Sequence, residues 1–437
     1  MKIQKPKLSF WQIWNLSFGF LGVQIGYSLQ NSNTSSIFQS LGADMSTLNY
    51  FWLAAPIAGL IIQPIVGMFS DSTWTKLGRR IPFILGGAIV SSIALMLMPN
   101  CPTLLSFAPL AMGAFLLLFM DSSFNVTMQP FRALVGDMLD DSQKTKGFVV
   151  QTFLVNLGAI IGGILPTVMT GIGVSDEVVP GQVPDHIAYS YYAGGAILLI
   201  TVLVTTFKVK EYPPKEFAMY NNIEDSESDQ KQSFVELMKN VPKVMLQLGV
   251  TQFFSWAALF LMWTYLKPAI EGVVCDPSGV VLSEGATQSW TGILNAAYPI
   301  PACIMALFMT QFANKFGNKV VYAFCLLCGA AGYIGLTMIS NKYLMLLPMV
   351  GIGIAWAGIL AMPYSILAKA IDARRMGVYM GIFNFTITIP QIFVGLIGGI
   401  VVDNLFGRDA ASMILLAGVF MIFAAVSVYF VKDELKK

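Results

Sequence analysis

Long apolar stretches alternate with short polar segments along most of this chain. A helix needs about 20 apolar residues to cross the hydrocarbon core of a bilayer, and twelve stretches of that kind can be read from the sequence. The predicted spans are Trp11–Gln30, Leu48–Phe69, Ile81–Met98, Phe107–Val135, Phe148–Thr170, Tyr189–Phe207, Val244–Leu266, Gln288–Met309, Val320–Ser340, Leu344–Ala368, Gly377–Val402 and Ser412–Val431. The pattern therefore predicts an all-α membrane protein with twelve transmembrane helices.

A polar linker separates the first six predicted spans from the last six. It covers residues 208–243 and contains two adjacent prolines and an acidic, serine-rich run. We therefore expect an N-terminal six-helix bundle over residues 1–207 and a C-terminal six-helix bundle over residues 244–437. A weak repeat supports duplication, because the loop at residues 69–80 resembles residues 312–319 at the equivalent place in the second half. Parallel six-helix repeats are typical of one large class of secondary transporters.

The basic residues sort onto alternate loops in the manner of the positive-inside rule. Lys267, Lys342 and Arg408 fall on one side of the predicted membrane, and the rest of the 26 basic residues fall on the other. A miscounted helix would mix the two sides. We therefore predict that both termini are cytoplasmic and that the protein lies in the cell (inner) membrane.

Composition fits lipid as the surrounding solvent and excludes several functions. The chain is 56% hydrophobic and only 11% charged, and its net charge of +2 gives no reason to expect a nucleic-acid partner. Cys325 and Cys328 have no accompanying Cys or His pair, so no metal site is predicted. No phosphate-binding Gly-x-x-x-x-Gly-Lys-Ser/Thr loop is present. We expect no catalytic residues and no cofactor, and therefore not an enzyme.

Several motifs resemble those of a known family. The loop Gly67-Met-Phe-Ser-Asp71 followed by Gly78-Arg79-Arg80 resembles the signature loop of the major facilitator superfamily. Its extension back to Gln63-Pro64 resembles the branch of sucrose–proton symporters and glycoside–pentoside–hexuronide carriers. Further similarities to the sucrose–proton symporters are Asp121, Asn125, Gln129-Pro130, Arg132-Ala-Leu134 and Asp137 in the fourth span, and Asn384 with Pro390-Gln391 in the eleventh.

The resemblance implies the major facilitator fold and the import of a disaccharide or related glycoside together with a cation. Sodium-coupled carriers of this branch place acidic residues in the second helix. Here the span Leu48–Phe69 contains no Asp or Glu. This departure favours the proton over sodium as the coupling ion.

Asp121 is the acidic residue that lies deep inside a predicted span. A carboxylate at this depth is costly, so it usually lines a functional cavity. The apolar surroundings favour the neutral, protonated form. A carboxyl group of this kind can take up a proton on one side of the membrane and release it on the other, so we predict that Asp121 couples transport to protons. A structural hydrogen bond between helices is the alternative interpretation.

The fourth span carries a polar stripe that ends in a basic residue. Asn125, Gln129 and Arg132 fall within an arc of about 80° from Asp121 at 100° per residue. We expect Arg132 at the cytoplasmic mouth, where it would meet Asp71 or Asp137, although it could serve only to anchor the topology. The predicted gating residues, which would hold and release the two halves, are Asp71, Arg79, Arg80, Arg132 and Asp137.

Sugar sites combine amide side chains with aromatic platforms. Gln24, Tyr27 and Asn31 follow one face of the first span, with Gln30 close by. In the second half, Gln252, Trp263 and Tyr298 are further candidates, although a single aromatic residue is more often packing. The predicted substrate-binding residues are Gln24, Tyr27, Asn31, Asp121, Asn125, Gln129, Gln151, Asn156, Trp256, Asn295, Trp356 and Asn384.

The expected function is proton-coupled import of a small glycoside, such as sucrose or maltose, by a monomer in the lipid bilayer. Two alternatives stay open. A proton-coupled efflux antiporter for amphipathic compounds would need a roomy apolar cavity, whereas the stripes here are rich in amides. A membrane sugar sensor that does not transport would need a signalling domain. Finally, Gly158-x-x-x-Gly162 and Gly377-x-x-x-Gly381 predict close helix packing within the chain.

Overall fold

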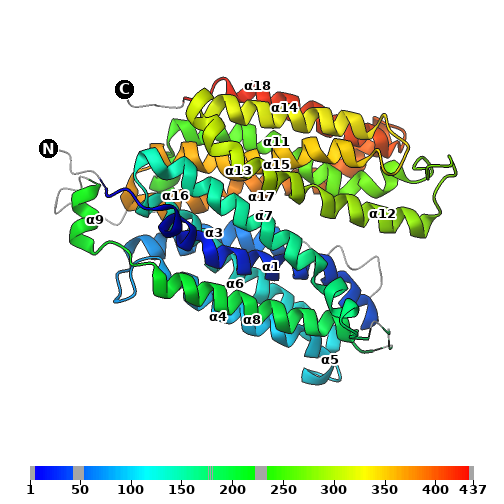
Figure 1. Cartoon of the computed structure of the whole chain (residues 1–437), viewed down its shortest axis with the longest axis horizontal. Helices are drawn as coiled ribbons and strands as arrows, with labels where there is room; N and C mark the ends of the chain where they lie inside the picture. Colours follow the sequence, from blue (N-terminus) through cyan, green and yellow to red (C-terminus); the bar gives the residue numbers. More distant parts are fainter. Residues whose placement is uncertain are drawn as a thin grey trace. The chain divides into compact units, whose positions relative to one another are not determined.

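The computed structural model describes residues 5–42, 54–175, 177, 179, 181–221 and 234–432. Figure 1 shows a chain built almost entirely of long helices. In the first half, these are α1 (Phe10–Ser40), α3 (Ala54–Ser72), α4 (Ile81–Leu97), α6 (Pro109–Met138), α7 (Asp141–Gly171) and α8 (Asp185–Lys208). In the second half, they are α11 (Lys243–Ile270), α12 (Glu284–Ala297), α13 (Pro299–Phe316), α14 (Asn318–Leu336), α15 (Leu346–Ala370), α16 (Met376–Phe383), α17 (Phe385–Asn404) and α18 (Ala410–Val428). The short elements are η1 (Met98–Asn100), α5 (Cys101–Leu104), α9 (Pro214–Tyr220), α10 (Phe234–Lys239) and η2 (Ala373–Arg375).

Ten membrane-spanning candidates are present among the described residues, by length and apolar composition. The remaining two predicted spans correspond to α1 and α3. The first six residues of the predicted span Leu48–Phe69 lie outside the described residues. The prediction of an all-α membrane protein with twelve spanning helices is confirmed.

Two predicted spans are divided in the structure. The eighth is α12 followed by α13, and the eleventh is α16 followed by α17. The first division falls at Tyr298, directly before Pro299 and close to Pro301, because proline cannot donate the helical hydrogen bond. The second falls at Asn384, whose N–H bonds to the carbonyl of Gly381 in a tight i to i−3 turn. Each pair still forms one membrane-spanning candidate, Trp290–Phe316 and Ala373–Asn404, so both predicted spans are present and each contains a local interruption of the helix.

The chain divides into two compact units. The first contains residues 1–238 together with Ile371–Asn384, and the second contains Lys239–Ala370 and Phe385–Lys437. This division differs from the predicted bundles, because α16 belongs to the second half by sequence and to the first unit by packing. The change of unit falls at the break between α16 and α17.

Glycines allow the close helix approaches within the first unit. A Cβ on Gly158 would lie 2.5 Å from the carbonyl oxygen of Leu21, and one on Gly162 would lie 2.6 Å from that of Ile25. The predicted close packing of this glycine pair is confirmed, and its partner is α1. Small residues at such crossings let the backbones of two helices touch. The contact fixes α1, and thus Gln30, against the rest of the unit.

Candidate functional site

Asp121 lies at the centre of a polar network inside the first unit. Asp121 is 2% exposed, and its Oδ1 accepts a hydrogen bond of 2.5 Å from Nε2 of Gln30 on α1. Leu117, Met120 and Phe124 on α6 are buried beside it and supply apolar surroundings. A buried carboxyl group requires hydrogen-bond partners, and here α1 supplies one.

Two further amides extend this network to α3. The Nδ2 of Asn125 donates to the backbone carbonyl of Asp121 at 2.7 Å, and its Oδ1 accepts from Nε2 of Gln63 at 2.6 Å. Asp121, Gln30, Asn125 and Gln63 are called the amide network below. Gln63 was not predicted as a site residue. Its signal in the sequence is an amide within an otherwise apolar span, next to Pro64.

Other predicted residues of the first half are distributed around this network. The ring of Tyr27 meets Phe124 edge to face, with centroids 5.9 Å apart. Gln24 is partly buried on α1, and Asn31 is exposed. Gln151 and Asn156 on α7 are buried, and their amides donate to the carbonyls of Phe131 and Thr152. A role for these residues in binding substrate stays a prediction.

A cluster of four charged side chains lies at one end of the first unit. Arg80 contacts Asp71 at 2.5 Å and Asp137 at 2.8 Å, and it is completely buried. Arg79 contacts the same carboxylates at 3.0 and 3.8 Å and is 2% exposed. We call Asp71, Arg79, Arg80 and Asp137 the charged cluster. Two arginines facing two carboxylates satisfy the main condition for burying charges, namely that they are paired.

The charged cluster holds the first turn of α16. The Oδ1 of Asp71 accepts from the N–H of Gly377 at 2.9 Å, and Oδ2 accepts from the N–H of Val378 at 2.7 Å. A carboxylate at a helix N-terminus satisfies free N–H groups and interacts favourably with the helix dipole. Arg79 adds a bond of 2.7 Å to the carbonyl of Arg374 just before the helix. Asp71 therefore serves as an N-terminal cap from a different part of the chain.

Glu211 is a third carboxylate at this end that sequence reasoning missed. Its Oε1 accepts from the backbone N–H groups of Arg80 and Ile81 at 2.7 and 2.8 Å, which caps α4. Burial raises the pKa of Glu211, and these two N–H groups together with the Arg80 charge oppose the rise. Nearby, Phe217 on α9 lies 4.8 Å from the guanidinium carbon of Arg79. These contacts attach the beginning of the linker to the charged cluster.

Arg132 lies three residues beyond Gln129 on α6 and is partly buried. The sequence predicts that Arg132 meets Asp71 or Asp137. Both carboxylates are engaged by Arg79 and Arg80 in this structure. The gating role predicted for these five residues stays a prediction.

The second unit gathers four aromatic side chains from three helical segments. Trp256 and Trp263 on α11, Trp356 on α15 and Tyr298 between α12 and α13 form this aromatic cluster. Trp356 lies at its centre, with ring centroids 5.5 Å from Trp256, 6.2 Å from Trp263 and 6.0 Å from Tyr298. All three pairs meet edge to face, the arrangement that aromatic quadrupoles favour. Trp256 and Trp356, both predicted for substrate binding, are thus brought together.

Polar groups beside this cluster have unused hydrogen-bonding capacity. The Oε1 of Gln252 accepts from the hydroxyl of Tyr322 at 2.9 Å. Among the described residues, Nε2 of Gln252, Nε1 of Trp256 and Oδ1 of Asn295 are buried without a hydrogen-bond partner. Buried polar atoms are nearly always paired, so unpaired ones mark a place where a ligand or water can bind. Asn384, the remaining predicted residue, belongs to the first unit and is buried at the end of α16.

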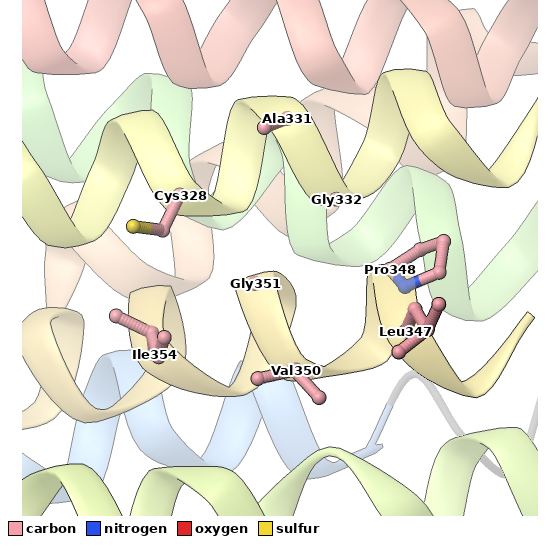
Figure 2. A pocket seen from close by; sticks show the side chains of 8 residues that line it. All are labelled: Cys328, Ala331, Gly332, Leu347, Pro348, Val350, Gly351 and Ile354. Atoms are coloured by element: carbon pink, nitrogen blue, oxygen red, sulfur yellow. The ribbon is translucent and has the colours of Figure 1, made fainter.

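A depression of about 400 Å³ between α14 and α15 has a different character. Figure 2 shows its wall of small and aliphatic side chains: Cys328, Ala331, Gly332, Leu347, Pro348, Val350, Gly351 and Ile354. A sugar site needs several convergent polar groups, and this wall offers only one thiol. None of the predicted substrate-binding residues lies in it. We therefore assign it no role in binding a sugar.

A helical membrane fold with a carboxyl group buried among amides, and a charged cluster that caps the helix α16, is typical of secondary transporters. The family model for MFS/sugar transport proteins matches residues 37–428. The chain therefore belongs to this family of transport proteins, in the major facilitator superfamily. The family resemblance seen in the sequence motifs is confirmed.

Similar proteins include plant sucrose transport proteins. The chain is 23% identical to sucrose transport protein SUT5 of Oryza sativa subsp. indica, over 93% of this chain and 84% of that protein. It is 26% identical to sucrose transport protein SUC4 of Arabidopsis thaliana, over 88% of this chain and 83% of that protein.

Solved structures share the fold at low sequence identity. The transporter FucP in the outward conformation superposes with a TM-score of 0.73 at 15% identity, covering 97% of this chain and 99% of that one. The proton:xylose symporter XylE bound to 6-bromo-6-deoxy-D-glucose gives 0.71 at 13% identity, with 97% and 96% covered. These similarities establish the twelve-helix fold.

Proposed function

We propose that this protein is a proton-coupled symporter that imports a small glycoside, such as sucrose, maltose or a related disaccharide, by alternating access. Asp121 carries the proton. The coupling ion is the proton and not sodium, and no cofactor takes part. The protein works as a monomer in the cell (inner) membrane with both termini in the cytoplasm.

The observation that supports this proposal is the environment of Asp121. Its carboxyl group is buried in the middle of α6, and Gln30 donates to one of its oxygens. The amide donor stabilises the ionised form, whereas the apolar walls favour the protonated form. Because these two influences oppose each other, a small movement of α1 relative to α6 can determine whether Asp121 keeps or releases its proton. This is the property that a coupling carboxyl group needs.

The aromatic cluster is the proposed platform for the sugar. The apolar face of a pyranose ring packs well on Trp and Tyr. The unpaired Nε1 of Trp256, Nε2 of Gln252 and Oδ1 of Asn295 supply two donors and one acceptor for hydroxyl groups. The relatives are sucrose transport proteins, which supports a disaccharide as the substrate. An amphipathic drug would leave these polar atoms unpaired, which disfavours the efflux alternative.

The test is uptake by Asp121→Asn in proteoliposomes with an imposed pH gradient. The variant keeps the shape of the side chain but cannot exchange a proton. We expect concentrative uptake of labelled sucrose or maltose to fall to the level of empty liposomes. Exchange of sugar between the two sides, which needs no net proton movement, should persist at a measurable rate.

Asp403→Asn is the matched control, because Asp403 is an exposed acid at the end of α17 that pairs with Arg408. This variant should accumulate sugar like the unmodified protein. Concentrative uptake by Asp121→Asn at the unmodified level would disprove the coupling role. If the unmodified protein takes up no labelled sucrose or maltose above the level of empty liposomes, the proposed substrate class is disproved.

A further inference from the structure

We propose that Gln129 is a positioning residue of the transport cycle, which ties α16 to α6 and keeps this end of the first unit closed. The proposal rests on the proposed function, because it concerns how α6, the helix that bears Asp121, is linked to α16 at the proposed cytoplasmic end. It departs from the prediction that Gln129 contacts the sugar.

The contact that carries this inference joins residues 248 positions apart in the sequence. Nε2 of Gln129 donates to the backbone carbonyl of Gly377, in the first turn of α16. Gln129 is completely buried, so it offers no surface to a sugar in this conformation. Its amide is instead used to hold a neighbouring helix.

The tie starts from the helix that bears Asp121. Gln129 follows Asp121 by eight residues, which is about 12 Å along α6, and both lie on the polar stripe of that helix. A tilt or rotation of α6 that accompanies protonation of Asp121 therefore moves the amide of Gln129 relative to Gly377. The hydrogen bond passes this movement directly to α16.

The first turn of α16 is held from two helices at once. Asp71 on α3 binds the N–H groups of Gly377 and Val378, and Gln129 on α6 binds the carbonyl of Gly377. The backbones of α3 and α16 also touch, because a Cβ on Gly381 would lie 2.5 Å from the carbonyl oxygen of Gln63. The first turn of α16 can therefore separate only when its hydrogen bonds to both α3 and α6 are broken. Loss of the Gln129 bond should make this release easier.

The test measures exposure of α16 and uses no sugar and no pH gradient. Val378, which is 2% exposed, is replaced by cysteine in a chain whose five native cysteines are replaced by alanine. The protein is placed in nanodiscs, so that both faces meet a maleimide reagent. We expect Gln129→Met, which keeps the side-chain length but removes the donor, to label about tenfold faster than the parent, because one buried hydrogen bond is lost.

Gln143→Met is the matched control. Gln143 exchanges two hydrogen bonds with Leu8, because Nε2 donates to its carbonyl and Oε1 accepts from its N–H, so this variant loses at least as many hydrogen bonds, but none to α16. It should label at the parent rate. If Gln129→Met does not fold, Gln129→Asn replaces it, since the amide one methylene shorter cannot reach Gly377.

Three results would overturn the proposal. The first is an unchanged labelling rate in a folded Gln129 variant. The second is equal acceleration by Gln143→Met, which would indicate general loosening. The third is a loss of glycoside affinity with unchanged labelling, which would make Gln129 a sugar ligand. Because labelling uses neither substrate nor gradient, this test can succeed even if Asp121→Asn contradicts proton coupling.

Discussion

At the scale of single residues, this protein buries charges and amides where water is scarce. The charged cluster and Asp121 are both buried, but they solve the problem differently. Arg79 and Arg80 are paired with two carboxylates, whereas Asp121 has an amide donor in Gln30. An ion pair of this kind stabilises the charged forms of both partners. A buried carboxyl group whose partner is a neutral amide lacks this constraint, and this difference separates the proposed coupling residue Asp121 from the charged cluster.

Lys5 precedes α1, lies outside the spans and is a partly buried charge. Burial, with the nearby Lys144 charge acting in the same direction, lowers the pKa of Lys5 from 10.5 to about 8. The unfolded chain therefore binds more protons between about pH 8 and 10.5, and stability rises with pH across this window. Below pH 8, the full cost of burying the charge is present.

We expect Lys5→Met to raise the apparent melting temperature of the detergent-solubilised protein at about pH 7, because the variant buries no charge. The gain should shrink as the pH rises through about 8 to 10.5. The exposed Lys7, replaced by Met, serves as the control and should show no such pH-dependent difference. A gain that is constant from about pH 7 to 10.5 would contradict the assignment.

At the scale of helices, the crossing of α3 and α16 brings the two backbones into direct contact. A Cβ on Gly67 would lie 2.4 Å from the carbonyl oxygen of Gly377 and 2.8 Å from Cα of Val378. Both are backbone atoms, so α16 itself would have to move. Overpacking of this kind costs about 1–3 kcal/mol.

Gly67→Ala should therefore speed the labelling of Val378→Cys several-fold and lower uptake. Gly86→Ala on α4 is the control, because a Cβ there meets no atom within 4 Å. This variant should label and transport like the parent. Equal effects of the two alanines would show that helix propensity, and not the crossing, determines the outcome.

At the scale of the whole molecule, one short helix of the second half completes the first unit. Because α16 packs on α3 and α6, a chain of residues 1–238 alone leaves the glycine face of α3 uncovered. We expect a tagged fragment 1–238 to be recovered in good yield only when it is co-expressed with fragment 239–437. The two fragments should then co-purify.

The control for this experiment is fragment 239–437 carrying Gly377→Leu. A Cβ at this position would already lie 2.7 Å from Oδ1 of Asp71 and 2.8 Å from the carbonyl oxygen of Gly67. The larger side chain should reduce co-purification strongly. Fragment 1–238 that is equally stable alone would contradict the assignment of α16 to the first unit.

The sequence alone determined the helices and the position of the buried carboxyl group. Burying polar backbone in lipid is so costly that each crossing must be an apolar helix, and this requirement can be read locally. For the same reason, a lone Asp in such a helix is visible without a structure. The motif around Asp71 and Arg79 likewise indicated the family before any contact was known.

Only the tertiary structure decided which partners these residues have. The sequence could not assign Arg80 to Asp137, Asp71 to the N–H groups of Gly377 and Val378, or Gln129 to the Gly377 carbonyl, because these pairings depend on how helices pack. The amide of Gln63 and the cap formed by Glu211 were missed for the same reason. A helix shows which face of it is polar, but its neighbours are set by backbone approach at glycines far apart in the chain, which no local pattern encodes.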